Sequence, residues 1–293
     1  MKKKIKINLF STIVFIIFAL FTISLFVLLS WGFLASLKDY YTDFISNKLG
    51  LPKVWSFKNY ITVFENYVVE VHDRFGSKQT INIVGQLFNT IVICGLSAFL
   101  LSFVPCWTGY LVAKYNYFFS KLMYSIALIA MALPIIGAYP SELDLLNKLG
   151  IYNSFLTILF QRSGYLGVYF FVYVACFKSI SNDFYDAATL DGASEIKVFF
   201  KVMFPMAINT FFTIFLLVFV ANWNDYQYAL LYLPSKPTLA YGLFRFFESP
   251  LQHLNNTPTA LAACFFLMIP ILVVFIIFKD RLMNNLSMGG LKE

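Results

Sequence analysis

The sequence is poor in charged residues, which make up 13% of its 293 positions, against about 25% in ordinary soluble domains. Hydrophobic residues make up 59%, and the mean hydropathy is +0.72. So few charged side chains cannot cover the surface of a water-soluble globule. The composition therefore excludes that class and favours a protein immersed in a lipid bilayer.

The sequence also lacks the residues that metal, redox and nucleotide sites need. The two histidines, His72 and His253, are far apart, and no two of the four cysteines form a Cys-x-x-Cys pair. No Gly-Lys dipeptide occurs, so the nucleotide-binding P-loop is absent. We expect no catalytic residues, no metal site and no cofactor in this chain, and we find no nucleophile–base constellation that would indicate a membrane-embedded enzyme.

Long apolar runs are what the sequence does contain. A membrane-spanning helix needs about 20 mostly apolar residues. We predict an all-α, polytopic membrane protein that forms a single transmembrane domain, 1–293, with six spans at 9–36, 84–113, 121–140, 155–178, 206–224 and 258–278. Arg162 interrupts the fourth span. Two interpretations stay open: its side chain reaches the outer rim of the membrane, or it lines a pathway.

The net charge of +7 does not indicate nucleic-acid binding, because its placement follows the membrane spans. Four lysines precede the first span, and Lys279, Arg281 and Lys292 follow the last one. Positive residues collect in cytoplasmic loops. We therefore expect both termini in the cytoplasm, with external loops at 38–78 and 225–255, a cytoplasmic loop at 181–205 and a cytoplasmic tail at 279–293.

The cytoplasmic loop at 181–205 predicts two short helices separated by a glycine break. Ser181 and Asn182 are candidate N-caps for a helix over Asp183–Leu190. Gly192 is suited to the left-handed conformation that ends a helix. Ser194 then caps a second helix, and Pro205 sets the entry into the fifth span.

The first of these helices carries only acidic charges, namely Asp183 and Asp186, with Asp191 at its end. A helix that lies in lipid headgroups normally carries Lys or Arg on its polar face. We therefore favour a helix that inserts into a groove on another protein over one that lies on the membrane.

Three parts of this loop resemble the "EAA" loop of the membrane subunits of bacterial ABC importers. They are Asp186-Ala187-Ala188, Asp191-Gly192-Ala193 and Val202-Met203-Phe204-Pro205, which have the spacing of the family pattern. The resemblance implies that the loop is the coupling helix, which seats in a cleft of a cytoplasmic ATPase. Asp186 stands where the family usually has Glu, and Ser181 stands where Pro is usual.

Two further motifs are similar to those of the maltose G-type permeases of carbohydrate importers. Trp223-Asn224-Asp225-Tyr226 is similar to the "WNDF" signature at the end of the fifth span, and Gly289-Gly290-Leu291-Lys292 is similar to the family's C-terminal tail. The resemblance implies that Gly289, Gly290 and Lys292 reach the ATPases. We expect Trp223, Asn224 and Asp225 from this motif, and Arg162 as an ionisable residue within a span, on the pathway or on the binding-protein side. For Asp225, a pairing within the subunit is equally open.

This resemblance implies a type I ABC importer permease in the bacterial cytoplasmic membrane, which carries a carbohydrate by alternating access. Its expected partners are a second permease subunit, two ATPases that bind ATP and Mg²⁺, an extracellular solute-binding protein, the sugar itself and membrane lipid. An ABC permease for a peptide or amino acid is the alternative. An ion-coupled secondary transporter is disfavoured, because midplane acids and inverted repeats are not evident.

Overall fold

The computed structural model describes residues 9–72, 77–133, 137–251, 254 and 256–288. The chain divides into two compact units, Met1–Val68 with Leu243–Ile269 and Val69–Gly242 with Pro270–Glu293. The two units are described separately below. The predicted all-α class is confirmed, since the one sheet is a short hairpin of β1 (Val69–His72) and β2 (Lys78–Ile81) within the described ranges.

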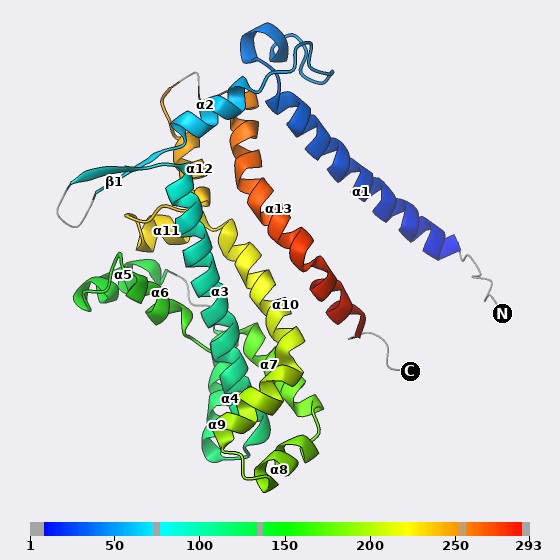
Figure 1. Cartoon of the computed structure of the whole chain (residues 1–293), viewed down its shortest axis with the longest axis vertical. Helices are drawn as coiled ribbons and strands as arrows, with labels where there is room; N and C mark the ends of the chain where they lie inside the picture. Colours follow the sequence, from blue (N-terminus) through cyan, green and yellow to red (C-terminus); the bar gives the residue numbers. More distant parts are fainter. Residues whose placement is uncertain (1–8, 73–76, 134–136, 252–253, 255, 289–293) are drawn as a thin grey trace. The chain divides into compact units, whose positions relative to one another are not determined.

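The second unit is built around α3 (Ile83–Lys114), which lies between α7 (Val168–Ser179) and α10 (Phe204–Trp223) (Figure 1). Aromatic side chains fill the region where the three helices meet. The Tyr110 ring lies 5.4 Å from that of Phe177 and 5.0 Å from that of Phe199, and all three are buried. This aromatic core holds the three helices together at the end of the bundle nearer α8 and α9.

Gly109 lets α3 and α7 approach closely. A Cβ at this position would lie 2.7 Å from the Tyr173 Cβ and 3.2 Å from the Val174 backbone nitrogen. Small residues at helix crossings have this effect in membrane bundles. Any side chain at Gly109 would therefore force the two helices apart.

Four helices are long and apolar enough to cross a membrane among the described residues, where the sequence predicts six spans. They are Leu9–Ser36, Ile83–Lys114, Glu195–Trp223 and Thr257–Phe278, and they match predicted spans one, two, five and six. The predicted third and fourth spans coincide with shorter apolar helices. These are α4 (Phe118–Ala132), in place of 121–140, and α7, in place of 155–178.

The prediction of one continuous helix over 155–178 is wrong. The chain forms α6 (Phe155–Arg162), leaves the helical conformation over 163–167, and re-enters it in α7. Gly167 immediately precedes α7 with φ 145° and ψ 179°, a conformation that is essentially restricted to glycine. Arg162 is thus the last residue of a separate short helix and does not lie inside the spanning helix.

The prediction for the third span is wrong at its C-terminal end, because α4 stops at Ala132. Beyond it, Tyr139–Lys148 forms a separate helix, α5, with Pro140 in its first turn. Proline is favoured there because the first-turn N–H groups have no intrahelical acceptor. Tyr139 and Pro140, which the prediction assigned to the third span, therefore belong to this separate helix.

Pro205 lies in the first turn of α10, but it does not start a new helix. The π-helical turn η2 (Phe199–Met203) joins α9 (Glu195–Val198) directly to α10. Proline cannot donate the backbone hydrogen bond of a regular helix, and its ring crowds the preceding turn. A wider turn just before Pro205 accommodates that ring, so one helix continues from Glu195 to Trp223.

The first unit contains α1 (Leu9–Ser36), η1 (Tyr40–Phe44), α2 (Lys58–Asn66) and the first part of α13 (Thr257–Met288). Asn59 ties them together: its Nδ2 donates to the carbonyls of Ser36 and Lys38, at 2.8 and 2.7 Å. The Asn59 Oδ1 accepts from the Thr259 hydroxyl at 3.3 Å. The polar residues after the first span therefore have a structural role.

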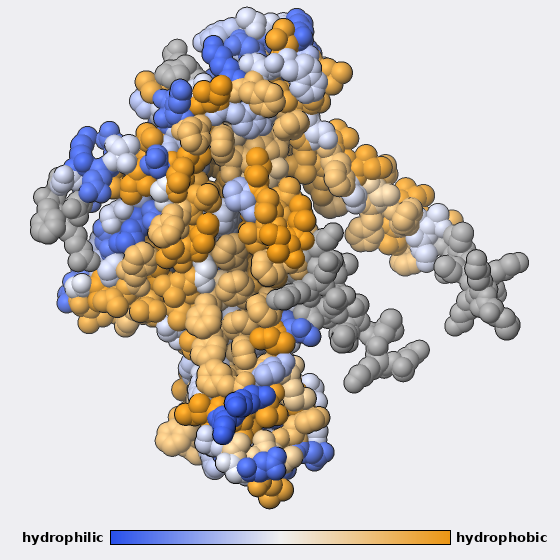
Figure 2. Space-filling view, in the orientation of Figure 1, coloured by the Kyte–Doolittle hydropathy of each residue, from blue (hydrophilic) through white to orange (hydrophobic). Residues whose placement is uncertain are grey.

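The remaining helices are α8 (Asp183–Leu190), α11 (Tyr226–Tyr232) and α12 (Leu239–Phe247). Within the second unit, α8 and α9 lie at one end of the α3–α10 bundle, while α5, α6 and α11 lie toward the other end (Figure 1). Figure 2 shows apolar residues over much of the surface between the polar hairpin and the α8–α9 end. This distribution is the one expected of a bundle that crosses a bilayer.

Candidate functional site

The loop between α7 and α10 forms the helix–glycine–helix structure that the sequence predicts. Helix α8 has the predicted bounds, Asp183–Leu190. Gly192 follows with φ 77°; its N–H donates to the Thr189 carbonyl at 3.0 Å, and the Ala193 N–H donates to the Ala188 carbonyl at 3.1 Å. This pair of bonds is the Schellman motif, which ends helices at a left-handed residue.

The predicted N-caps act differently from the prediction. Neither Asn182 nor Ser194 makes a side-chain capping bond. The Ser181 hydroxyl instead accepts from the Asp183 N–H at 3.2 Å and donates to the Asp183 carboxylate at 2.8 Å. Asn182 is engaged elsewhere, because its Oδ1 accepts from the Lys114 ammonium at 2.8 Å.

Helix α8 has no buried residue, and all of its residues except the half-buried Tyr185 and Ala188 are exposed. Its acids Asp183 and Asp186 and its small residues Ala187 and Ala188 leave a shallow face. Large apolar side chains flank this face: Leu190 is 88% exposed, and Phe184 and Ile196 are 51% and 63% exposed. Exposed apolar groups beside a polar rim mark surfaces that bind other proteins.

A glutamate joins the two short helices to the end of α3. The Glu195 carboxylate accepts hydrogen bonds from the Tyr185 hydroxyl, at 2.8 and 3.0 Å, and from the Tyr115 hydroxyl. Burial and the bond to Glu195 raise the pKa of Tyr115 above its usual value. We call Tyr115, Tyr185 and Glu195 the tyrosine–glutamate clamp. No local sequence motif indicates this clamp, because Tyr115 and Glu195 are 80 positions apart.

Replacing Glu195 with alanine should loosen α8 from α3. A hydrogen bond to a charged group contributes about 1.5–3 kcal/mol, and two tyrosines lose their acceptor together. We expect faster hydrogen exchange at the α8 amides and a smaller response of any partner that docks there. Glu195→Gln keeps an acceptor and should be affected less. Equal exchange at α8 in Glu195→Ala and the wild type would contradict the clamp.

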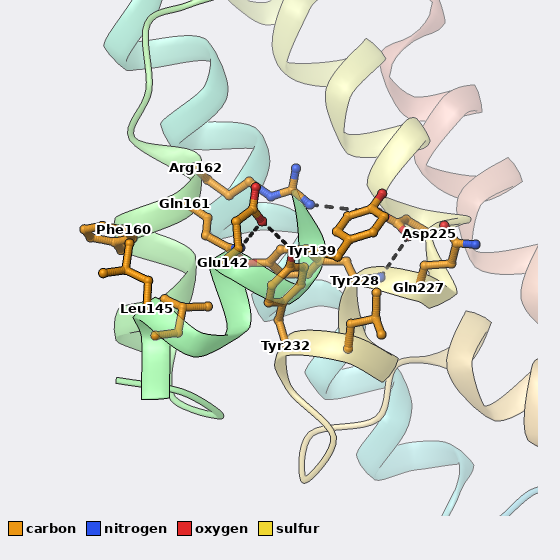
Figure 3. A pocket seen from close by; sticks show the side chains of 12 residues that line it. Tyr139, Glu142, Leu145, Phe160, Gln161, Arg162, Asp225, Gln227, Tyr228 and Tyr232 are labelled. Atoms are coloured by element: carbon orange, nitrogen blue, oxygen red, sulfur yellow. Dashed lines mark hydrogen bonds and ion pairs between the residues drawn. The ribbon is translucent and has the colours of Figure 1, made fainter. Parts of the chain in front are cut away.

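A second cluster of polar residues surrounds a cavity of about 410 Å³ toward the other end of the second unit (Figure 3). Helices α5, α6 and α11 provide its walls. Glu142 accepts hydrogen bonds from the Gln161 side chain at 3.2 Å and from the Tyr232 hydroxyl. One carboxylate therefore joins the neighbouring helices α5 and α6 to α11, whose Tyr232 is 90 positions from Glu142.

Arg162 and Asp225 meet in this cavity, so the structure brings two of the predicted site residues together. The Arg162 guanidinium carbon lies 4.0 Å from the centroid of the Tyr228 ring, and a guanidinium nitrogen lies 3.8 Å from the Asp225 carboxylate. The ion pair is long and partly exposed, and such pairs contribute about 0–1 kcal/mol. The Arg162 guanidinium therefore lies against both the Tyr228 ring and the Asp225 carboxylate (Figure 3).

Asp225 pairs within the subunit, which was one of the three interpretations that the sequence left open. Its carboxylate also accepts from the Tyr228 N–H at 3.0 Å and caps the start of α11. Burial raises the pKa of Tyr228 to about 12. The cavity wall also contains three buried polar atoms without a hydrogen-bond partner among the described residues, namely Gln161 Oε1, Arg162 Nε and the Tyr228 hydroxyl.

The other predicted site residues lie away from this cavity or outside the described chain. Trp223 is 1% exposed and ends α10. The Asn224 side chain donates back to the Val220 carbonyl at 3.1 Å. Neither lines the cavity. Gly289, Gly290 and Lys292 lie outside the described residues.

The family assignment follows from comparison with known proteins. Residues 106–287 match the family model described as the binding-protein-dependent transport system inner membrane component. The chain belongs to this family. It is therefore a membrane component of a binding-protein-dependent ABC importer, and it resides in the cytoplasmic membrane as a multi-pass protein. The matched residues include α8, α9 and the whole polar cavity.

Curated inner-membrane components of several importers are similar to this chain over most of their length. The melibiose/raffinose/stachyose import permease MelC of Bacillus subtilis is 25% identical over 76% of this chain and 82% of MelC. The trehalose/maltose permease MalG of Thermococcus litoralis is 26% identical over 83% and 85%. The diacetylchitobiose uptake permease NgcG of Streptomyces coelicolor is 23% identical over 96% and 88%.

A solved structure shows the same fold. A chain in the crystal structure of a bacterial ABC transporter that imports the acidic polysaccharide alginate aligns with a TM-score of 0.71 at 19% identity. The alignment covers 96% of this chain and 99% of that one. The overall fold, with its short helices α4 and α7, is therefore shared with a solved ABC transporter chain.

Proposed function

We propose that this chain is a permease subunit of an ATP-driven importer for a carbohydrate. The class of carbohydrate that we propose is an oligosaccharide. The subunit forms half of a pathway that opens alternately to the two sides of the membrane. The family assignment supports the transport role. Relatives that carry melibiose, trehalose and diacetylchitobiose in their names support a sugar over a peptide or amino acid.

One observation carries the proposed mechanism: an exposed, acidic helix is hydrogen-bonded to the end of a spanning helix through Glu195. The Schellman turn at Gly192 fixes the angle between α8 and α9, and the clamp fixes both to α3. Such an element moves as one body with α3. A partner that grips α8 can therefore move the spanning helix without first deforming the loop.

The partner that we propose is an ATPase, and the whole transporter would contain two of them. This chain lacks a P-loop, so ATP and Mg²⁺ would bind to the ATPase subunits. The acids of α8 would face basic residues of the ATPase, and Leu190 and Phe184 would enter apolar parts of its cleft. The tail residues Gly289, Gly290 and Lys292 remain predicted contacts of the same subunits.

The remaining partners are a second permease subunit and an external solute-binding protein. With both termini in the cytoplasm, α8 faces the cytoplasm, and the cavity of Arg162 and Asp225 lies toward the external end of its unit. We propose that this cavity borders the external opening. The unpartnered polar atoms of Gln161, Arg162 and Tyr228 would gain partners when the pathway opens there.

The test is reconstitution of the complete transporter, with its co-purifying binding protein, in lipid vesicles. We expect the binding protein to retain an oligosaccharide and that sugar to stimulate ATP hydrolysis and uptake. A binding protein that retains a peptide or amino acid would favour the alternative permease. Uptake by vesicles that contain this chain alone would refute an ATP-driven mechanism.

A further inference from the structure

A second pocket lies where the end of α3 meets α4, α7 and the start of α8. Its volume is about 590 Å³. Lys114, Lys121 and Lys178 contribute to its lining, and none of its lining residues is acidic. Three positive charges around one hollow favour an anionic occupant.

Two of these lysines have unmatched charge. Lys114 is engaged, because its ammonium donates to the Ile180 carbonyl and to Asn182 Oδ1, both at 2.8 Å. Lys121 and Lys178 are exposed and form no ion pair with any residue that the structure describes. The Lys178 ammonium lies 5.8 Å from the centroid of the Tyr124 ring, on one side of the pocket.

The helices beside the pocket present apolar side chains to their surroundings. On α4, Leu122 and Ile126 are 41% and 42% exposed, and Ile129 is 59% exposed. On α7, Val172 is 40% exposed. The lysines thus sit at the ends of apolar helices, where long side chains place their charge at the headgroup level of a membrane.

We propose that this pocket binds the anionic headgroup of a membrane phospholipid. The phosphate would lie between Lys121 and Lys178, and the acyl chains would run along the apolar faces of α4 and α7. Soluble phosphate would pair with the lysines equally well, but it has no acyl chains to contact the adjoining apolar surface of α4 and α7. The combination of charge and apolar surface therefore favours a lipid.

The bound headgroup would also change the contacts at the start of the loop 181–205, which we call the docking loop. Lys114 bonds to Asn182, the residue immediately before α8, and the Asp186 carboxylate lies close enough to influence Lys114 electrostatically. An anion beside Lys114 competes with those contacts. The lipid composition of the membrane would thereby adjust how firmly α8 is held at its start.

The experiment uses the complete transporter, reconstituted in nanodiscs that contain phosphatidylcholine with or without phosphatidylglycerol. Native mass spectrometry then counts the lipids that stay bound after the nanodisc is removed. We expect a retained phosphatidylglycerol for each copy of this chain in the wild type. The double variant Lys121→Gln/Lys178→Gln should lose it, because each lysine beside an anionic surface favours binding roughly five-fold, or about 25-fold together.

Two controls separate the pocket from general charge effects. Lys121→Arg/Lys178→Arg keeps both charges and should retain the lipid. Lys48→Gln/Lys58→Gln removes two exposed lysines outside the pocket and should also retain it. If the glutamine variant does not assemble, the single variants and the wild-type preference for phosphatidylglycerol over phosphatidylcholine provide the same test.

Three results would overturn the proposal. The wild type would show no preference between the two lipids, or the glutamine variant would keep the bound phosphatidylglycerol. The third contrary result is that inorganic phosphate at modest excess displaces the lipid, which would identify a site for soluble anions. Each result is independent of whether the transported solute is a sugar.

Discussion

Gly192→Pro should abolish substrate-stimulated ATP hydrolysis by the assembled transporter while leaving the chain inserted in the membrane. Gly192 has φ 77°, whereas the proline ring holds φ near about −65°. The substitution also removes the N–H that donates to the Thr189 carbonyl. The turn between α8 and α9 cannot form, so movement of an ATPase at α8 no longer reaches α3. The measurement is ATP hydrolysis with and without the loaded binding protein.

Two further glycine variants make this test specific. A Cβ at Gly192 meets no atom within 4 Å, so Gly192→Ala costs only the backbone strain of about 1–2 kcal/mol and should keep most of the stimulation. Gly150 also has positive φ, 68°, and bonds to Asn147 at the end of α5. Gly150→Pro disturbs a similar turn far from α8 and should remain stimulated. Full stimulation in Gly192→Pro would count strongly against the docking role.

Asp186→Arg should reduce stimulated ATP hydrolysis by tenfold or more. Asp186 is exposed and forms no ion pair within the described part of the chain. Its charge is therefore available to a partner. If it faces a basic residue of the ATPase, the reversal replaces an attraction with a repulsion, and a change of about 1.4 kcal/mol already corresponds to tenfold. Binding of the purified ATPase to the variant measures the same loss directly.

The matched variants for Asp186 are conservative and remote. Asp186→Glu introduces the residue that the resembled motif usually carries and should preserve stimulation. Asp144→Arg reverses an exposed helical aspartate on α5, at the other end of the unit, and should leave ATPase binding unchanged. The same binding affinity for wild type and Asp186→Arg would show that this carboxylate does not contact the ATPase.

The helix bounds and the glycine turn of the loop 181–205 were predictable because their signals are local, whereas the capping roles of Asn182 and Ser194 were not. A left-handed glycine and the hydrogen bonds of the turn involve residues within five positions of one another. The bounds Asp183–Leu190 are confirmed for that reason. The clamp was not predictable, because a tyrosine at the end of α3 and a glutamate on α9 meet only after α3, α7 and α10 have packed.

The fourth span was mispredicted because a spanning helix was required to have about 20 residues, so one helix was drawn through Arg162 and across the break at 163–167. Gly164 and Gly167 are weakly hydropathic but strongly permissive of non-helical backbone, and they are the signal that was available. Only part of the polar cavity could be predicted from the sequence. Arg162 and Asp225 were identified as unusual residues, but their common place beside Tyr228 depends on how α6 and α11 fold against each other.

The interruption at Ser163–Gly167 restricts which side of this unit can touch hydrocarbon. Helix α7 has 12 residues and is about 18 Å long at about 1.5 Å per residue, whereas the apolar layer is about 30 Å thick. If this segment crosses the apolar layer, irregular backbone must cover the part that α7 does not reach. The amides and carbonyls of that backbone need hydrogen-bond partners, which acyl chains cannot provide. Hydrocarbon against this stretch would leave those groups without hydrogen-bond partners, so we expect another polypeptide or water on the flank that exposes it.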